Sequence, residues 1–254
     1  MTHIAWVPKR WVKQAQGALD GLAERHPSRT ILLYPEPDAG EDAIEADGDL
    51  RCFAGSGGSD QVCWEVASIH LLGSRAAWPA TVVLPLFLPD LPVFLRWRGP
   101  VGSSEGELEL VRTVDRLVID SSECPDLHYE FTKLADLFDD VVVSDIAWAR
   151  ANPWREAVAR LWPAVADASE VRVAGPEADA RLLAAWLSAR LGRTVELRHE
   201  PAGEIELVEV AGRKAEPGRA DLRTASDLLS DELDVFTRDR VYEEAVRAVC
   251  DGAG

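Results

Sequence analysis

Three of the strands expected from the sequence end in residues that could hold an anionic ligand. In an open parallel sheet, ligands bind outside the carboxyl ends of the strands, so side chains at these ends predict a pocket with arginine clamps and a carboxylate. A second explanation is that strands end in polar residues because the chain meets water there, and both explanations stay open. The residues are Arg96 and Arg98 at the end of one strand, Asp120 and Ser121 at the end of the next, and Ser144 and Asp145 at the end of the third.

Arginine and tryptophan also stand side by side at two places, within residues 94–98 and within residues 148–155. Guanidinium groups stack on indole rings and bind carboxylates in a forked geometry, so such clusters suit an interface with a carboxylate-bearing partner. The alternative is that the tryptophans lie in the core and the arginines at the surface. The candidate partner-binding residues are Arg96, Trp97, Arg98, Trp148, Arg150, Trp154 and Arg155.

Sequence signatures of catalysis do not accompany these residues. The sequence has no phosphate-binding glycine motif, zinc-protease motif or nucleophile elbow, and its five histidines are widely separated. We therefore expect no catalytic residue, no metal and no cofactor. The glycine-rich stretch at 55–59 lies between two expected strands, which favours a hairpin turn over a phosphate loop.

The composition indicates a globular protein and excludes some partners. The net charge of −17 argues against nucleic acid, because binding to phosphates depends on clustered Lys and Arg. The longest apolar stretch, residues 81–95, is broken by prolines well short of the roughly 20 residues of a membrane span. No secretory signal is visible, so we expect a cytoplasmic location without membrane contact. Four scattered cysteines suggest reduced thiols rather than a disulfide framework: Cys52, Cys63, Cys124 and Cys250.

Strands and helices are expected to alternate, which is typical of crossovers around a parallel sheet. We predict an α/β fold with a mixed, largely parallel sheet and helices on both faces. It has two α/β parts, residues 1–164 and 165–254, which are either separate domains or halves of one sheet. Expected strands are 29–34, 50–54, 61–72, 93–97, 116–120, 141–143, 171–174, 194–198 and 204–210. Expected helices are 14–25, 76–88, 129–138, 152–162 with Asn152 as its cap, 176–191, 226–236 and 238–249, and an acidic loop is expected at 34–49.

Several blocks resemble, in order, those of the OpcA family of glucose-6-phosphate dehydrogenase assembly proteins. Many members have two adjacent tryptophans where this chain has Arg96-Trp97-Arg98, so only Trp97 carries over. The matching blocks are 26–29, 83–93, 115–121, 144–145 with 148–150, and 153–156, followed by the less distinctive 182–187 and 239–245.

The resemblance implies a non-catalytic protein that binds glucose-6-phosphate dehydrogenase and promotes its active oligomer in the oxidative pentose phosphate pathway. In some members the thiol oxidation state tunes this effect, but no cysteine here can be matched to a regulatory position. Two rival hypotheses stay open. One is an α/β enzyme or sensor that binds a sugar phosphate or similar anion through Arg96, Arg98, Arg150 and Asp145, and the other is a structural subunit of another complex.

Overall fold

The computed structural model describes residues 1–22, 28–54, 61–102, 104–218 and 225–252 of the 254-residue chain. The glycine-rich turn at 55–59 and the end of the helix expected at 14–25 lie outside these residues. Within the described ranges, no helix combines the length and the apolar character needed to cross a membrane.

The chain folds into two compact units. The first contains Met1–Ile119, Asp140–Val142 and Ala225–Phe236, and the second contains Asp120–Asp139, Val143–Thr224 and Thr237–Gly254. Each unit is therefore assembled from segments that are far apart in the sequence. The boundary expected near residue 164 stays a prediction.

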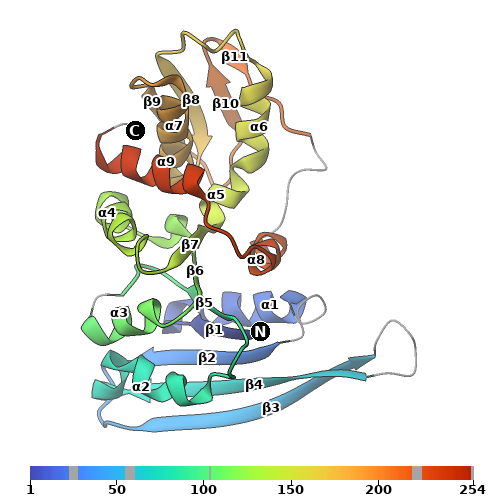
Figure 1. Cartoon of the computed structure of the whole chain (residues 1–254), viewed down its shortest axis with the longest axis vertical. Helices are drawn as coiled ribbons and strands as arrows, with labels where there is room; N and C mark the ends of the chain where they lie inside the picture. Colours follow the sequence, from blue (N-terminus) through green and yellow to red (C-terminus); the bar gives the residue numbers. More distant parts are fainter. Residues whose placement is uncertain (23–27, 55–60, 103, 219–224, 253–254) are drawn as a thin grey trace. The chain divides into compact units, whose positions relative to one another are not determined.

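The first unit is built on a sheet in the order β3-β4-β2-β1-β5-β6-β7 (Figure 1). β1 pairs in parallel with both β2 and β5, the parallel pairing continues to β4 and β6, and the hairpin of β3 and β4 is antiparallel. The predicted α/β fold with a largely parallel sheet is confirmed. The strands are β1 (Thr2–Trp6), β2 (Arg29–Glu36), β3 (Ile44–Ala54), β4 (Gln61–Leu72), β5 (Val93–Trp97), β6 (Arg116–Ile119) and β7 (Val142–Asp145), which runs on into the second unit.

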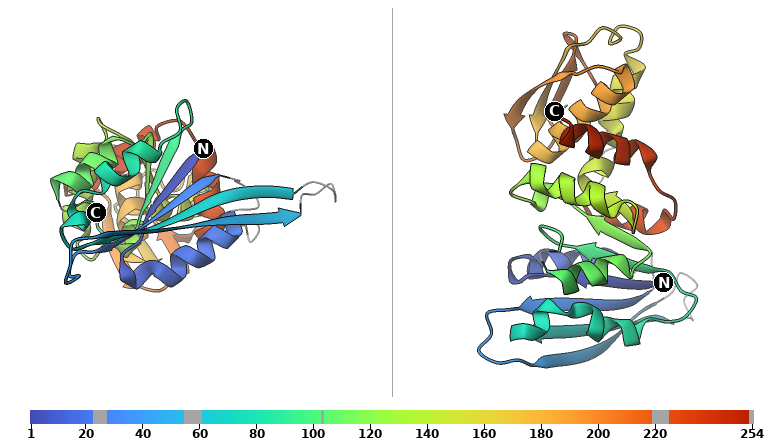
Figure 2. Two further views of the ribbon diagram at one scale, coloured as in Figure 1. Left: turned by 90° about the horizontal axis from the view of Figure 1, so that it is seen from below. Right: turned by 60° about the vertical axis from the view of Figure 1, so that its left-hand side comes forward.

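Helices lie on both faces of this sheet (Figure 2). The amphipathic helix α1 (Val12–Leu22) covers one face, where Ala15 packs with Leu32, Tyr34 and Val66. On the other face, α3 (Glu105–Arg112) begins with a capping box in which the Ser104 and Glu107 side chains bind each other's backbone N–H groups. The remaining helices of the unit are η1 (Lys9–Trp11), η2 (Gly73–Ala77), α2 (Pro79–Val83), η3 (Leu84–Leu86) and α8 (Ala225–Asp234).

Two expectations about this unit are wrong in part. The helix expected at 76–88 is broken into η2, α2 and η3, because the prolines at 79, 85 and 89 remove backbone N–H donors and favour turns. The acidic loop expected at 34–49 becomes a strand from Ile44, since residues 44–54 pair with β4 over their whole length. The alternation of Glu45, Asp47 and Asp49 with smaller residues suits an edge strand exposed to water.

The second unit holds a four-stranded mixed sheet in the order β11-β10-β8-β9. β8 is parallel to β9 and antiparallel to β10. Gly192 ends the long helix α7 in the left-handed conformation, with φ of 65°, as expected for a glycine cap. The elements are η4 (Ser121–Glu123), α4 (Leu127–Leu137), α5 (Ile146–Arg150), α6 (Asn152–Arg160), β8 (Glu170–Gly175), α7 (Glu177–Leu191), β9 (Glu196–Pro201), β10 (Leu207–Val210), β11 (Arg213–Lys214) and α9 (Arg240–Cys250).

The cap expected at Asn152 is wrong. α5 ends at Arg150, so α6 begins almost directly after it, and the residue in the cap position is Ala151. The Asn152 side chain points along the helix instead and donates a 2.9 Å hydrogen bond to Glu156 Oε1. The helix also ends at Arg160, which leaves Trp162 exposed rather than on the packed face.

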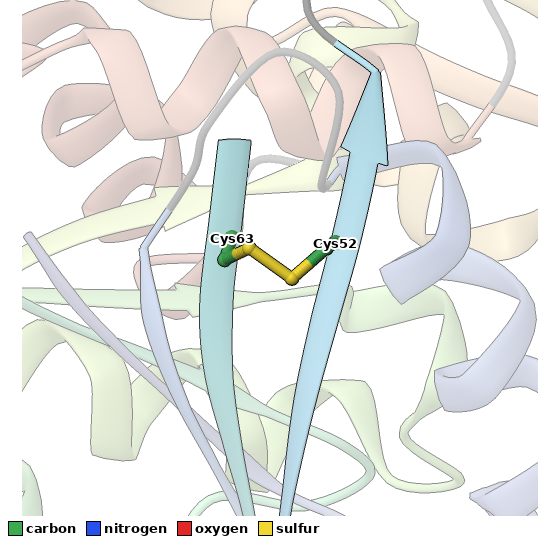
Figure 3. Close-up of a disulfide and its surroundings, with 2 residues drawn as sticks. All are labelled: Cys52 and Cys63. Atoms are coloured by element: carbon green, nitrogen blue, oxygen red, sulfur yellow. A yellow bond between two sulfur atoms is a disulfide. The ribbon is translucent and has the colours of Figure 1, made fainter. Parts of the chain in front are cut away.

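Cys52 and Cys63 form a disulfide between β3 and β4, whereas reduced thiols were expected (Figure 3). The antiparallel register places the two residues directly opposite each other, with Cα atoms 4.1 Å apart. The sequence does not reveal this pairing, because it depends on the register of the hairpin. Cys124 and Cys250 are free thiols, as expected.

We expect two of the four cysteines to react with iodoacetamide when the purified protein is unfolded without reductant, and all four after reduction. The double variant Cys52→Ser/Cys63→Ser should give two labels under both conditions. Mass spectrometry of the labelled chain measures this directly. Four labels without reductant would show that the β3–β4 pair is reduced in the purified protein.

Candidate functional site

The residues singled out from the sequence fall into two groups, one in each unit. Arg96, Trp97 and Arg98 lie at the end of β5 in the first unit. The others gather in the second unit around η4, α5 and α6, and they are Asp120, Ser121, Ser144, Asp145, Trp148, Arg150, Trp154 and Arg155. Arg98 and Arg150 are partly exposed, and every other member of the two groups is buried.

In the first unit, Trp97 is part of the core. Its ring stacks on Trp6 of the neighbouring strand with centroids 4.6 Å apart, and its indole N–H donates to the Pro100 carbonyl at 2.8 Å. Only 1% of the residue is exposed. Arg96 is buried beside it and donates to the carbonyl oxygens of Trp97 and Val118. These contacts explain both residues as packing and hydrogen-bonding elements of the sheet.

Arg98 has a different setting. Its guanidinium lies 5.6 Å from the centre of the Trp11 ring, and Arg10 approaches the same ring at 5.5 Å. Cation–π contacts at a partly exposed ring stabilise weakly, by about 0.5–1 kcal/mol. An Arg–Trp contact therefore exists at this site, but its ring belongs to Trp11, which is not among the predicted residues.

Asp145 is the centre of the group in the second unit. It is the last residue of β7 and caps α5, where its Oδ1 accepts hydrogen bonds from the backbone N–H groups of Ser121 at 3.0 Å and Ala147 at 2.9 Å. Its Oδ2 accepts a 3.2 Å hydrogen bond from the Tyr242 hydroxyl. One carboxylate thus joins the chain after β6, the start of α5 and the C-terminal helix α9.

Arg150 lies between two carboxylates. Its Nε and Nη2 donate to the two oxygens of Asp179 at 2.7 and 2.9 Å, and its Nη1 and Nη2 contact Asp120 at 3.4 Å. Burial alone would lower the pKa of Arg150, but the hydrogen bonds to Asp179 and the charge of Asp120 outweigh burial and raise it. Arg150 therefore stays charged and is bound on both sides within its own unit.

A stack of aromatic and cationic groups connects α5, α6 and α9. The Arg155 guanidinium lies 3.3 Å from the centre of the Trp148 ring, and its Nη1 donates to the Trp148 carbonyl at 2.6 Å. The Trp148 indole donates to Asp239 at 2.7 Å, and Asp239 caps α9 through the N–H groups of Val241 and Tyr242. This arrangement fixes the beginning of α9. The predicted Trp–Arg cluster therefore connects α5, α6 and α9 within the second unit.

Trp154 packs elsewhere in the same unit. It belongs to the hydrophobic core between α6, α7 and the four-stranded sheet, together with Val158, Val173 and Leu183. Only 7% of Trp154 is exposed. Its spacing with Ala157 and Val158 on the helix correctly predicts a packed face.

Sequence reasoning missed three residues that complete the group, Asp179, Asp239 and Tyr242. Asp179 is fully buried in the first turn of α7. It stands three, four and seven residues before Leu182, Leu183 and Trp186, on the same helix face. A carboxylate on an apolar face is a signal that could have identified it as the partner of a buried cation. No such signal marks Asp239 or Tyr242. Both lie in the block 239–245, which resembles the OpcA family.

The arrangement favours proton binding over anion binding. Asp120 and Asp179 face a single guanidinium, and the charge of Asp120 also acts on Asp145, so a phosphate at this place would be repelled by the carboxylates. Among the residues that the structure describes, no group of three or more His, Cys, Asp or Glu side chains is placed to hold a metal ion. The free thiol of Cys124 is buried, and burial together with nearby carboxylates raises its pKa, which disfavours the reactive thiolate.

Comparison with protein families covers most of the chain. Residues 20–136 match a model described as the glucose-6-phosphate dehydrogenase subunit N-terminal domain, and residues 141–246 match one described as the C-terminal domain of the same subunit. The chain belongs to the OpcA family. The family resemblance drawn from the sequence blocks is thus confirmed. Comparisons with curated proteins and with solved structures gave no match.

Within this OpcA chain, Asp145 makes stability depend on pH. Burial, and then the charge of Asp120, raise the pKa of Asp145 from 3.8 to about 7, although hydrogen bonds from Ser121 and Ala147 oppose this. Between these values the folded chain keeps a proton that the unfolded chain has lost. The stability that this bound proton confers on the folded chain is therefore complete below about pH 4 and is lost as the pH rises through about 7.

Between about pH 4 and pH 7, we expect the free energy of unfolding to fall by up to about 1.4 kcal/mol per pH unit because of Asp145. Asp145→Asn should flatten the slope, while Asp167→Asn, which alters an exposed carboxylate of the same unit, should leave it unchanged. Urea unfolding at several pH values from about 4.5 to 7.5 measures the slope. Equal slopes for the wild type and Asp145→Asn would contradict the assignment.

Proposed function

We propose that this chain is a non-catalytic partner of glucose-6-phosphate dehydrogenase that binds the enzyme and promotes its active oligomer. The observation that carries the proposal is the pair of consecutive family matches, over residues 20–136 and 141–246, both described as parts of a glucose-6-phosphate dehydrogenase subunit. We place this role in the oxidative pentose phosphate pathway, in the cytoplasm.

The geometry of the second unit supports a non-catalytic role. A catalytic acid or base must reach the proton that it transfers, but Asp145 accepts hydrogen bonds from Ser121, Ala147 and Tyr242 within its own unit. Arg150, the cation that could clamp an anion, is bound to Asp179 and Asp120. The polar groups at the strand ends are thus used for holding the fold.

Activation by a binding partner needs only a difference in affinity between two states of the enzyme. A preference of about 2 kcal/mol would shift a two-state population roughly thirtyfold. A few well-packed side chains at an interface can supply such a difference. The proposed function therefore requires a contact surface and no active site in this chain.

The test is to mix the purified chain with purified glucose-6-phosphate dehydrogenase and to follow the rate of glucose 6-phosphate oxidation and the mass of the complex. We expect a higher rate together with a larger particle in light scattering, with and without reductant. Unchanged rate and mass under both conditions would overturn the proposal. Saturable binding of glucose 6-phosphate to the chain alone, measured by calorimetry, would favour the rival anion sensor.

A further inference from the structure

A long uncharged stretch stands out in this acidic chain. Residues 76–89 contain no Asp, Glu, Lys or Arg and only one polar side chain, Thr81, in a sequence in which 28% of residues are charged. With the turn that follows, the stretch forms the path from η2 through α2 and η3 to the start of β5 (Figure 1). We call residues 78–91 the apolar segment.

The apolar segment exposes large hydrophobic side chains on its outer side. Its inner side is also apolar, since Pro79, Ala80 and Val83 are buried. A surface helix of a globular unit normally presents polar residues to water, and clustered apolar exposure marks an interaction site. The exposed side chains, with their exposed fractions, are Trp78 (51%), Leu84 (40%), Leu88 (40%) and Leu91 (41%).

The apolar segment is held in place by the rest of the first unit. Arg29 donates a 2.9 Å hydrogen bond to the Leu86 carbonyl and pairs with Glu65 on β4. At the other end, the Trp78 ring lies against Gly106 of α3, where an added Cβ would stand 2.8 Å from a ring carbon. A fixed conformation reduces the entropy lost on binding, so this surface is suited to a protein partner.

Charged residues border the apolar segment. Asp90 near the end of the segment and Arg75 just before its start are exposed, and Glu105 at the start of α3 is also exposed. A partner that covers the leucines would therefore meet mainly carboxylates at the border, within a molecule of net charge −17. The complementary surface is an apolar patch with Lys or Arg around it.

We propose that the apolar segment is the surface through which the first unit binds glucose-6-phosphate dehydrogenase. This inference rests on the proposed function, because the family description supplies the partner and the structure supplies the place. Leu84 and Leu88 are the central contacts, Trp78 anchors one end, and Arg29 is a positioning residue that acts through the Leu86 carbonyl.

The test compares Leu84→Asp/Leu88→Asp with the wild type for binding to the purified dehydrogenase by light scattering and calorimetry. Both leucines are 40% exposed, and we expect at least tenfold weaker binding from a variant whose thermal unfolding shows that it is folded. Leu50→Asp is the matched control, since Leu50 is 66% exposed on β3 of the same unit. We expect it to bind like the wild type.

The milder pair Leu88→Gln/Leu91→Gln serves if the charged variant does not fold, and we expect it also to weaken binding by at least tenfold. Binding of the folded variants within twofold of the wild type would overturn the inference and leave the proposed function standing. Absence of binding by the wild type would overturn both. A chain that dimerises alone, and whose dimer the Leu84→Asp/Leu88→Asp variant abolishes, would assign the segment to self-association instead and so overturn the inference.

Discussion

Arg150→Met is expected to lower the free energy of unfolding by about 3–5 kcal/mol, because it leaves the buried carboxylates of Asp179 and Asp120 without their cation. Chemical denaturation followed by tryptophan fluorescence measures the loss. Arg160→Met is the matched control, since the ion pair of Arg160 with Glu156 is exposed on both sides and contributes at most about 1 kcal/mol.

A second variant distinguishes a lost ion pair from lost packing. Replacing both partners, as Arg150→Met/Asp179→Leu, removes the uncompensated charge of Asp179 and should recover part of the stability lost in Arg150→Met. If Arg150→Met costs no more than Arg160→Met, the buried pair is not a stabilising element of the second unit.

Trp97→Ala should lower the free energy of unfolding by about 3–5 kcal/mol, as truncation of a buried aromatic residue does. The ring is 1% exposed and stacks on Trp6, and its N–H group has a backbone partner. The control is Trp162→Ala, which truncates a tryptophan that is 63% exposed and should change stability by less than about 0.5 kcal/mol.

The same variant tests the sequence-based prediction that Trp97 binds the partner. If Trp97→Ala unfolds at the wild-type temperature but loses its effect on glucose-6-phosphate dehydrogenase, Trp97 is a contact residue. If the thermal transition moves down, as we expect, Trp97 supports the fold. Trp154, which packs in the core of the second unit, can be examined in the same way.

Local patterns in the sequence predicted much of the fold. Residues 93–97, which are apolar except for Arg96, form a strand with a neighbour on each side, as a largely apolar strand should. The helix expected at 176–191 is α7, and the hairpin of β3 and β4 agrees with the two strand-like runs on either side of the glycine-rich stretch. The prediction of one helix at 76–88 was wrong because the prolines in and after this stretch interrupt a helix, although its apolar composition is compatible with one.

The candidate site was harder to predict because its members meet over long distances in the sequence. Asp179 is 29 residues from Arg150, and Tyr242 is 97 residues from Asp145. No local spacing shows such pairs, and the register that joins Cys52 to Cys63 is equally hidden. Arginine and tryptophan side chains can bind a partner protein, but the same stacking and forked hydrogen bonds also hold a fold together.

The return of the chain to the first unit has a consequence for how this protein is made. α8 contacts α1, and Phe236 just after α8 packs edge-on against Phe94 of β5. A ribosome must therefore synthesise nearly all of the chain before the first unit can close. A recombinant fragment that stops near residue 142 would lack α8, leave the Phe94 ring without that neighbour, and be prone to aggregate during expression.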